Sequence, residues 1–286
     1  MNIGIIGLGL IGGSFGRAII KNTEHTVYGH DINSDSLLKA QMLPAIHYQL
    51  TDKECAILDL LIIALTPKLS VSVMEEYLPK LSENTIVLDI AGNKTKIVLA
   101  MCDAAIRYPN INFVASHPMA GREFSGINHA IASLFEKASA IIVPIEHNIA
   151  SANLVKHFLL SLGFSEIVIS SAKTHDKIIS YTSQLPHIIS SSYIKSPTAL
   201  KHDGFSAGSF RDISRVAKLN SKMWTELMLE NKDNILFELD FFINSLLEYK
   251  EALDTNDANK LESLLEEGNS IKEMIEKASR EHKRIL

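Results

Sequence analysis

The spacing of hydrophobic positions changes near residue 170. Before that point, short continuous apolar runs alternate with amphipathic stretches. Continuous apolar runs are typical of strands that are buried on both faces of a parallel sheet. The runs that predict strands are Asn2–Gly7, Thr26–Gly29, Leu58–Ala64, Thr85–Ile90, Asn112–Ala115, Ala140–Pro144 and Glu166–Ile169.

The stretches between these runs have helical periodicity. The predicted helices are Leu10–Lys21, Ser70–Leu81, Lys94–Ile106 and Ala150–Leu162. Alternation of strand and helix indicates right-handed βαβ units, because parallel strands need a crossover connection. The first 170 residues are therefore predicted to form an α/β domain with a doubly wound, Rossmann-type sheet.

From about Ser171 onward no run predicts a strand, and apolar residues recur at helical spacing. They are Leu227, Ile235, Leu239, Phe242 and Leu246, and later Leu261, Leu264, Leu265, Ile271, Met274 and Ile275. Asp254–Asn259 is a polar break between two long helices. Residues 171–286 are predicted to form an all-helical domain. Because ~115 residues cannot bury both apolar stripes internally, we expect a symmetric homodimer.

Composition and charge exclude several classes of protein. The chain has 286 residues, 46% hydrophobic and 21% charged, with a net charge of −5. This balance argues against general binding of nucleic acid or anionic membranes. Cys55 and Cys102 are the only cysteines, so we expect neither a disulfide framework nor a metal site. Since no run approaches the ~20 apolar residues of a membrane span and none resembles a signal peptide, we expect a cytoplasmic protein.

A glycine-rich turn follows the first predicted strand. Gly7, Gly9 and Gly12 form a GxGxxG pattern that opens the helix Leu10–Lys21. Gly7 allows a tight turn, Gly9 allows close approach of a pyrophosphate, and Gly12 allows close packing of helix on sheet. The main-chain N–H groups at the helix start, including those of Leu10 and Ile11, favour a diphosphate. Together these features predict a dinucleotide site.

Two further positions extend this cofactor site. Asp31 ends the second strand ~20 residues after the glycines, where a carboxylate accepts hydrogen bonds from the adenosine ribose. Its charge would repel a 2′-phosphate, so NAD is favoured over NADP. Leu65 and Thr66 follow the strand Leu58–Ala64 at its carboxyl end. Thr66 contacts the cofactor, caps the next helix, or does both.

Several motifs in the rest of the chain occur together and in order. They are SHPMAGRE at 116–123, His175-Asp176, Leu185-Pro186-His187 and GSFRDISRVA at 208–217, followed by Trp224 and Asn231. This set resembles the prephenate/arogenate dehydrogenase family, whose pattern reads approximately HPxAGxE, HD, SHLPH and GFRDxTRIA. The resemblance runs from the first strand to the last helices.

The resemblance implies an NAD-dependent oxidative decarboxylation. A hydride leaves C4 of a cyclohexadienol, a base removes the proton of the C4 hydroxyl, and loss of carbon dioxide makes the ring aromatic. The substrate is prephenate or arogenate, and no metal takes part. His117 would be the base, since imidazole titrates near neutral pH. Arg215 would bind a substrate carboxylate through its guanidinium fork.

The resemblance places further residues around the substrate. His187 would face the pocket, with Ser183 one helical turn earlier, and Pro186 would kink the helix that carries them. Glu123 would pair with the pocket arginine. Asp212 would either orient Arg215 or cap a helix, and Trp224 would lie near a dimer-related pocket or pack in the core.

The sequence departs from the family pattern in three places. The family often has a serine near the reacting hydroxyl where this chain has Gly92, so Asn93 or water would supply that hydrogen bond. Gln184 stands where a histidine is frequent, which removes one titratable group. Ser214 replaces a threonine and should be nearly neutral.

Two other functions remain open. A β-hydroxyacid or imine reductase-like dehydrogenase also joins a Rossmann domain to helices, and it would use a lysine such as Lys173 or Lys177. The SHPMAG and FRDISR segments have no role in that scheme. A non-catalytic NAD-binding sensor is the alternative from another class, and it would bind NAD tightly without turnover.

Overall fold

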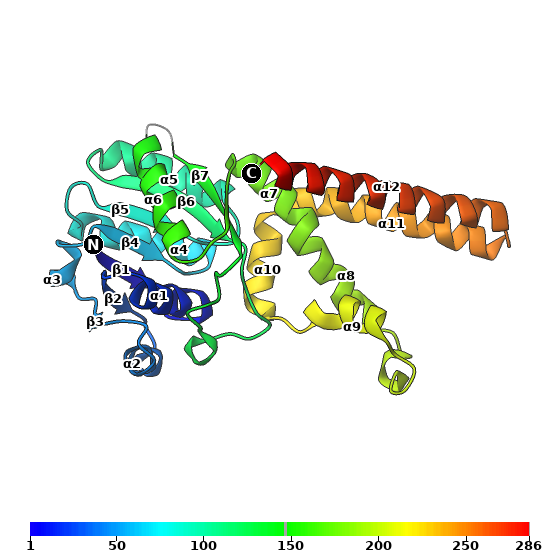
Figure 1. Cartoon of the computed structure of the whole chain (residues 1–286), viewed down its shortest axis with the longest axis horizontal. Helices are drawn as coiled ribbons and strands as arrows, with labels where there is room; N and C mark the ends of the chain where they lie inside the picture. Colours follow the sequence, from blue (N-terminus) through cyan, green and yellow to red (C-terminus); the bar gives the residue numbers. More distant parts are fainter. Residues whose placement is uncertain (146–147, 286) are drawn as a thin grey trace. The chain divides into compact units, whose positions relative to one another are not determined.

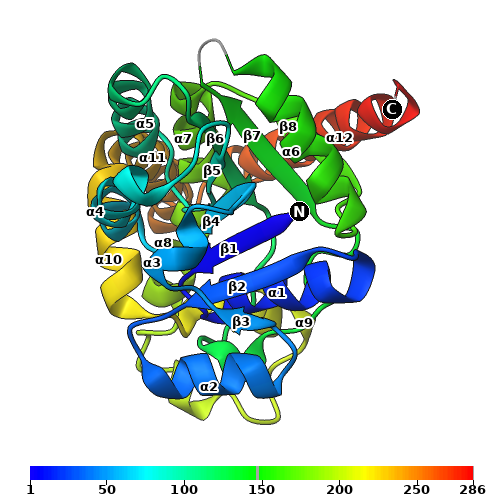
Figure 2. The same ribbon diagram turned by 90° about the vertical axis from the view of Figure 1, so that its left-hand side faces the viewer.

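The structure is a computed structural model that describes residues 1–145 and 148–285, and in these residues eight strands form one sheet (Figure 1). The strands are β1 (Asn2–Ile6), β2 (Thr26–His30), β3 (Tyr48–Gln49), β4 (Leu60–Ile63), β5 (Ile86–Asp89), β6 (Asn112–Pro118), β7 (Ser139–Pro144) and β8 (Glu166–Ile169). Their order is β3-β2-β1-β4-β5-β6-β7-β8, seen edge to edge in Figure 2. Every pair is parallel except β6 with β7, so the sheet is mixed.

Helices connect and follow these strands. They are α1 (Leu10–Asn22), α2 (Ser34–Met42), α3 (Asp52–Cys55), α4 (Pro67–Tyr77), α5 (Thr95–Arg107), α6 (Ile149–Ser161), α7 (Ala172–Ile179), α8 (Leu185–Tyr193), α9 (Gly208–Ser214), α10 (Ser221–Glu230), α11 (Lys232–Asp254) and α12 (Ala258–Ile285). Short helical turns are η1 (Leu78–Lys80), η2 (Ile127–His129), η4 (Ala199–Lys201) and η5 (Arg215–Ala217), and η3 (Ser180–Gln184) is a π-helix.

Two hydrophobic cores lie on the two faces of the sheet. Successive side chains of a strand point to opposite faces, so Ile3 and Ile5 of β1 belong to one core and Ile6 to the other. Helices α1, α2 and α6 contribute to the first core, and α4 and α5 contribute to the second (Figure 2). This double cover explains why the strands appear in the sequence as continuous apolar runs.

The predicted α/β fold with a following helical segment is confirmed, with three differences. Each predicted strand is present, but the short edge strand β3 was not expected, because its two residues, Tyr48 and Gln49, are both exposed and form no apolar run. The antiparallel direction of β7 has no signature in its apolar pattern. Strand β6 also runs three residues past the predicted end at Ala115, because its last residues pair with β7.

The extension of β6 corrects the predicted location of His117. The predicted strand ended at Ala115 and so left this histidine outside it, but His117 lies within β6 and pairs with Ile141 of β7. Met119 N donates to Ser139 O at 2.9 Å, which continues the pairing beyond Pro118. A strand holds a catalytic side chain more rigidly than a loop.

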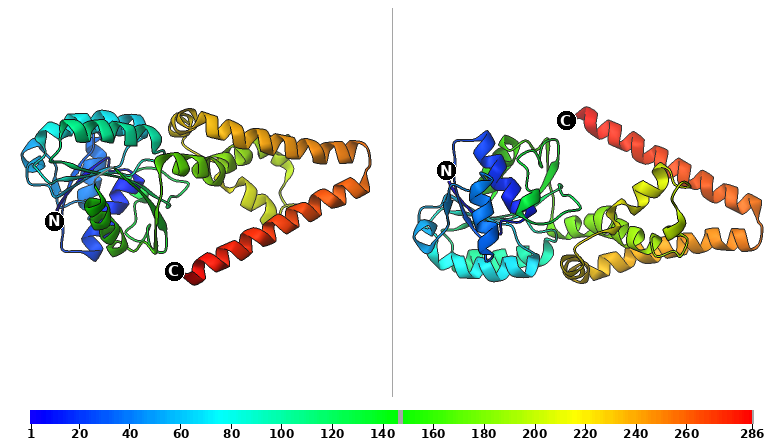
Figure 3. Two further views of the ribbon diagram at one scale, coloured as in Figure 1. Left: turned by 90° about the horizontal axis from the view of Figure 1, so that it is seen from above. Right: turned by 90° about the horizontal axis from the view of Figure 1, so that it is seen from below.

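Two compact units divide the chain between Asn234 and Ile235. The first unit therefore includes α7 to α10 as well as the sheet. The second contains the rest of α11 with α12, two long helices joined by a short turn (Figure 3). The functional division near residue 170, where strand–helix alternation ends, stays a prediction. No helix in the described parts of the chain is long and apolar enough to cross a membrane.

Candidate active site

The carboxyl ends of β1, β4, β5 and β6 meet at one edge of the sheet, and most of the predicted site residues lie there. In open α/β sheets this edge is where ligands bind, because the loops and helix starts that follow the strands converge on it. The helices that begin at this edge are α1, α4 and α5. Side chains from α7, η3 and α10 reach the same edge from the helical part of the first unit.

His117 belongs to a hydrogen-bonded chain of three side chains. Its Nδ1 lies 2.9 Å from Nε2 of His175, whose Nδ1 lies 2.7 Å from Oδ1 of Asp176. Because an ionised carboxylate only accepts, His175 carries its proton on Nδ1 and presents Nε2 as an acceptor. His117 then donates its Nδ1–H to His175. The hydrogen-bond pattern thus assigns a tautomer in which Nε2 of His117 carries the free lone pair.

Asp176 is held firmly by the start of α5. Its two carboxylate oxygens accept the main-chain N–H groups of Lys94 and Thr95, each at 2.8 Å. Lys94 itself is fully buried, and its ammonium contacts the carboxylate of Asp89 and the carbonyl of Ser116. The hydrogen-bonded chain of side chains that ends at His117 is therefore attached to β5, α5 and β6.

Burial sets the protonation of this cluster. Burial lowers the pKa of His117 well below its usual value, and its electrostatic interactions with His175 and with the Lys94 ammonium lower it further, against a smaller opposing effect of Asp176. Burial also lowers the pKa of His175, although its hydrogen bond to Asp176 opposes this. Burial alone would raise the pKa of Asp176, but its hydrogen bonds outweigh this and lower it. Both imidazoles are thus neutral at pH 7.

A buried network of amides lies beside this cluster and corrects one expectation. Nδ2 of Asn93 donates to Leu227 O at 2.8 Å, and its Oδ1 accepts from Nε2 of Gln184 at 2.9 Å. Oε1 of Gln184 in turn accepts from Asn231 at 2.6 Å, and Asn231 also donates to the carbonyl of Asp176. Asn93 is therefore used structurally, and its amide is not turned toward a substrate hydroxyl in place of a serine.

Leu227 also fills the space beside Gly92. A Cβ atom at this position would lie 3.3 Å from Cδ2 of Leu227, which is tighter than usual contact. Gly92 stands where the family often has a serine, and Leu227 of α10 packs into the space beside it.

His187 and Trp224 form a stacked pair. Their ring centroids lie 3.8 Å apart at an interplanar angle of 30°. Nδ1 of His187 also lies 2.8 Å from the carbonyl of Ser183, one turn earlier. Pro186 has no N–H, and the helix before it widens into the π-helix η3, so the predicted irregularity is present. Ser183 therefore contacts His187 through its main-chain carbonyl, and Trp224 contacts it through the face of its ring.

Arg215 and Glu123 form an ion pair at 2.7 Å, as expected for the acidic partner of this arginine. The pair is accessible, with 66% of the Arg215 side chain and 38% of the Glu123 side chain exposed. The pKa of Glu123 lies below its usual value, first because of its own main-chain amide and then because of Arg215. Asp212 has no hydrogen bond or ion pair to any described residue, so it neither orients Arg215 nor caps a helix.

The glycine turn fits a dinucleotide. Gly7 has φ = 89°, which favours glycine, and a Cβ on Gly12 would lie 1.9 Å from the carbonyl of Gly7. A Cβ on Gly9 would meet no atom within 4 Å, so the backbone there is open to a ligand. No side chain caps α1, and its first turn holds no acidic residue. Leu10 and Ile11 begin this helix, whose free N–H groups suit a diphosphate.

The carboxylate of Asp31 supports this turn. Oδ2 accepts from Leu8 N, and Oδ1 accepts from Asn33 N, both at 2.8 Å. Each oxygen keeps a second lone pair for a ribose hydroxyl. Thr66 is the N-cap residue of α4, but its hydroxyl does not cap that helix and instead donates to Oε2 of Glu226 at 3.1 Å.

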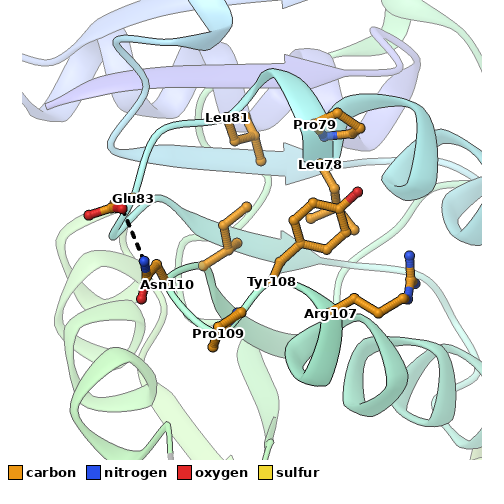
Figure 4. A pocket seen from close by; sticks show the side chains of 9 residues that line it. Leu78, Pro79, Leu81, Glu83, Arg107, Tyr108, Pro109 and Asn110 are labelled. Atoms are coloured by element: carbon orange, nitrogen blue, oxygen red, sulfur yellow. Dashed lines mark hydrogen bonds between the residues drawn. The ribbon is translucent and has the colours of Figure 1, made fainter.

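A separate hollow lies at the opposite edge of the sheet, before the amino ends of β5 and β6 (Figure 4). Its lining is Leu78, Pro79, Leu81, Glu83, Arg107, Tyr108, Pro109, Asn110 and Ile111. Asn110 donates to Glu83 at 3.0 Å, and Arg107 is paired with Glu75 at 2.9 Å. Because its polar groups are already paired and it lies away from His117, we do not assign the reaction to it.

The hydrogen bonds, ion pairs and ring contacts bring the predicted site residues together in several separate groups. Among the described residues no hydrogen bond links His117 to His187 or to Arg215. Sequence reasoning assigned no catalytic or binding role to the partners of the site residues, all of them buried except Glu226, namely Asp89, Lys94, His175, Asp176, Gln184, Glu226, Leu227 and Asn231. Two signals in the sequence could have identified some of these partners. One is the dipeptide His175-Asp176 at the start of a helix, and the other is Lys94, a lone lysine after a strand.

Two family models match this chain. The model described as "Prephenate dehydrogenase, nucleotide-binding domain" matches residues 15–168, and "Prephenate dehydrogenase, dimerization domain" matches residues 171–267.

Individual relatives agree. The chain is 32% identical to a cyclohexadienyl dehydrogenase of Zymomonas mobilis over 91% of each protein. It is 32% identical to a prephenate dehydrogenase of Bacillus subtilis over 90% of this chain and 71% of that protein. A crystal structure of prephenate dehydrogenase from A. aeolicus with hydroxyphenyl propionate and NAD+ superposes with a TM-score of 0.80 at 27% identity, covering 96% of this chain and 98% of that one.

Proposed function

The chain belongs to the prephenate dehydrogenase family, and on this basis we propose that it oxidises prephenate to 4-hydroxyphenylpyruvate with NAD and releases carbon dioxide. The observation that carries the proposal is the chain His117–His175–Asp176, which leaves a neutral imidazole with a free Nε2 lone pair. A base in this state is what removal of a hydroxyl proton at neutral pH requires.

The reaction balances with one base and one hydride acceptor. His117 Nε2 takes the proton of the C4 hydroxyl while the C4 hydride leaves, and the C4–O bond becomes a carbonyl. The ring carboxylate then leaves as carbon dioxide, and its bonding electron pair aromatises the ring. The carbonyl oxygen becomes a phenolate, which takes back the proton from Nε2 of His117 to give the phenol. NAD, when bound, supplies the hydride acceptor. Asp176 stabilises the imidazolium that forms, through His175.

Arg215 and His187 serve the substrate in this proposal. Arg215 binds a carboxylate of the substrate by exchanging it for Glu123, because that ion pair is exposed and costs little to open. His187, which contacts the Ser183 carbonyl and stacks on Trp224, is proposed to contact the same substrate. The proposal also keeps Gly92 and Asn93, which follow β5 at the cofactor edge of the sheet, and Asp212, on the helix just before Arg215, as residues beside the substrate.

NAD is held by the residues of the glycine turn. Gly7, Gly9 and Gly12 shape the turn, and the N–H groups of Leu10 and Ile11 bind the diphosphate. Asp31 binds the adenosine ribose and disfavours a 2′-phosphate, while Leu65 and Thr66 lie beside the next part of the cofactor.

Arogenate is the second candidate substrate. The Zymomonas relative is named a cyclohexadienyl dehydrogenase, a name that is not limited to prephenate. Arogenate differs from prephenate only by an amino group in place of a keto group on the side chain. The same base and the same hydride acceptor therefore serve both substrates.

The deciding experiment measures NADH formation by the purified protein with prephenate and with arogenate, offered separately, and with NADP as a control. Turnover of prephenate with NAD supports the proposal, and the ratio of kcat/KM values gives the preference. Absence of turnover with both substrates, despite binding of NAD, would contradict it and favour a sensor.

We further propose a homodimer formed through residues 171–286, with residues 1–170 as the cofactor domain. The matching model for residues 171–267 is a dimerization domain, which supports the assembly. Only two cysteines occur in the chain, which supports a cytoplasmic location.

A further inference from the structure

The amino end of α4 is capped by a carboxylate from a distant helix. Thr66 does not cap α4 with its own hydroxyl, and Pro67 has no N–H to offer. The N–H of Lys68 donates to Oε1 of Glu226 at 3.0 Å, and the hydroxyl of Thr66 donates to Oε2 at 3.1 Å. Glu226 of α10 thus supplies a cap that the local sequence of α4 lacks.

This contact determines how Thr66 can bind a ligand. An ionised carboxylate has no hydrogen to donate, so the hydroxyl hydrogen of Thr66 is committed to Glu226. The oxygen of Thr66 keeps its lone pairs. Thr66 therefore faces a ligand as an acceptor and not as a donor.

Thr66 lies next to the glycine turn. A Cβ on Gly7 would meet the carbonyl of Ala64 at 2.6 Å and Cδ2 of Leu65 at 2.7 Å, so the residues just before Thr66 pack directly on that turn. A dinucleotide bound there offers ribose hydroxyls and a carboxamide N–H as donors. These donors complement the acceptor that Glu226 leaves on Thr66.

The helix that carries Glu226 also holds the substrate side of the site. Trp224 stacks on His187, and the carbonyl of Leu227 accepts from Asn93. One helix, α10, therefore contacts the loop after β4, the loop after β5 and the helix that carries His187.

We propose that Glu226 is a positioning residue for the cofactor, which acts through Thr66 by holding its hydroxyl as an acceptor for a ribose hydroxyl or carboxamide donor of NAD. The inference rests on the proposed function in taking NAD as the ligand. It adds a residue from the helical segment to a site otherwise built by the sheet.

The test is calorimetric titration of NAD into the full-length protein and its variants. In Glu226→Gln the amide oxygen still accepts from Lys68, but the amide N–H donates to Thr66 and occupies its acceptor position. We expect the Kd for NAD to rise roughly 3–10-fold, as for loss of one hydrogen bond. Thr66→Val should show a similar rise, and Thr66→Ser should bind as the wild type does.

A double variant tests whether Glu226 acts through Thr66. Thr66→Val combined with Glu226→Gln should bind NAD no more weakly than Thr66→Val alone, because the two changes remove the same interaction. Glu24→Gln, an exposed change of the same charge with no described partner, is the control and should leave the Kd unchanged.

In steady-state kinetics Glu226→Gln should raise the KM for NAD more than it changes kcat.

Two outcomes overturn the inference: a wild-type Kd in Glu226→Gln, or rises in Kd that multiply in the double variant. Either result alongside normal prephenate turnover leaves the proposed function intact. Conversely, a wild-type protein that binds NAD but turns over neither substrate contradicts the proposed function alone. A wild-type protein that does not bind NAD contradicts both.

Discussion

Gly9 and Gly12 belong to the same turn but are constrained by different things. A side chain on Gly12 would collide with the carbonyl of Gly7, which is backbone and cannot move aside. A side chain on Gly9 would meet open space in the protein. Gly12 is therefore required by the fold, and Gly9 is required by the ligand.

This difference predicts opposite effects of two alanine substitutions. Gly9→Ala should keep the melting temperature of the wild type but weaken NAD binding at least about tenfold, since its methyl group blocks the approach of the diphosphate. Gly12→Ala should lower the melting temperature, because helix α1 must shift. Thermal unfolding and calorimetry on both variants check this, and equal stability of the two would contradict it.

The lowered pKa of His117 predicts the pH dependence of turnover. Only the neutral imidazole accepts a proton, and burial keeps His117 neutral below the usual histidine pKa of 6.5. We expect kcat/KM to rise with pH to a plateau whose acid midpoint lies below 6.5. His117→Asn should lower kcat by roughly 10²–10⁴-fold and leave NAD binding unchanged. An acid midpoint above 6.5 would argue against His117 as the base.

At the scale of elements, the helices at the cofactor edge differ in what occupies their amino ends. Asp176 accepts from the start of α5, and Glu226 accepts from the start of α4. Helix α1 has no such side chain. The helical segment thus neutralises two of these positive helix ends and leaves the one that suits an anionic cofactor.

The amide network between α5, η3 and α10 predicts a stability effect. Gln184→Met keeps the side-chain length but leaves Asn93 and Asn231 with unmatched buried groups. We expect a loss of about 1–3 kcal/mol in the free energy of unfolding, measured by urea denaturation. Gln41→Met, an exposed substitution in α2, is the control. If both variants unfold at the same urea concentration, the network does not contribute.

Sequence reasoning located most elements but not their pairings. The runs in β1, β4 and β5 are apolar because both sheet faces are covered, so they were predictable. The direction of β7 was not, because a continuous apolar run is the same in either direction. The end of β6 was also missed, since Ser116 and His117 interrupt the apolar run and only pairing with β7 makes them strand.

At the scale of the whole molecule, the second unit has little core of its own. Within its described residues only Ile235 and Ala252 are buried hydrophobics. Large apolar side chains are exposed along α11 and α12, including Phe237, Phe241, Leu246, Leu247, Leu265, Met274 and Ile275. Two helices with this much exposed apolar surface need a partner surface.

We therefore expect the protein to sediment as a dimer at micromolar concentration. Phe241→Glu should shift the equilibrium toward monomer, because it places a charge in an apolar interface. Asn244→Glu, an exposed substitution on the same helix, should leave the dimer intact. Sedimentation velocity measures both variants, and a monomeric wild type would refute the expected assembly.

The sequence by itself determined the α/β class, the glycine turn with Asp31, the helical character after residue 171, and His117 and Arg215 as candidates. These features are local: a period, a turn or a motif is written within a few neighbouring residues. Only the tertiary structure decided that His175 and Asp176 orient His117, that Gln184 completes an amide network, and that Glu226 holds Thr66. These contacts join residues 47 to 160 positions apart. Local patterns carry no record of such distant partners, because folding alone brings them together.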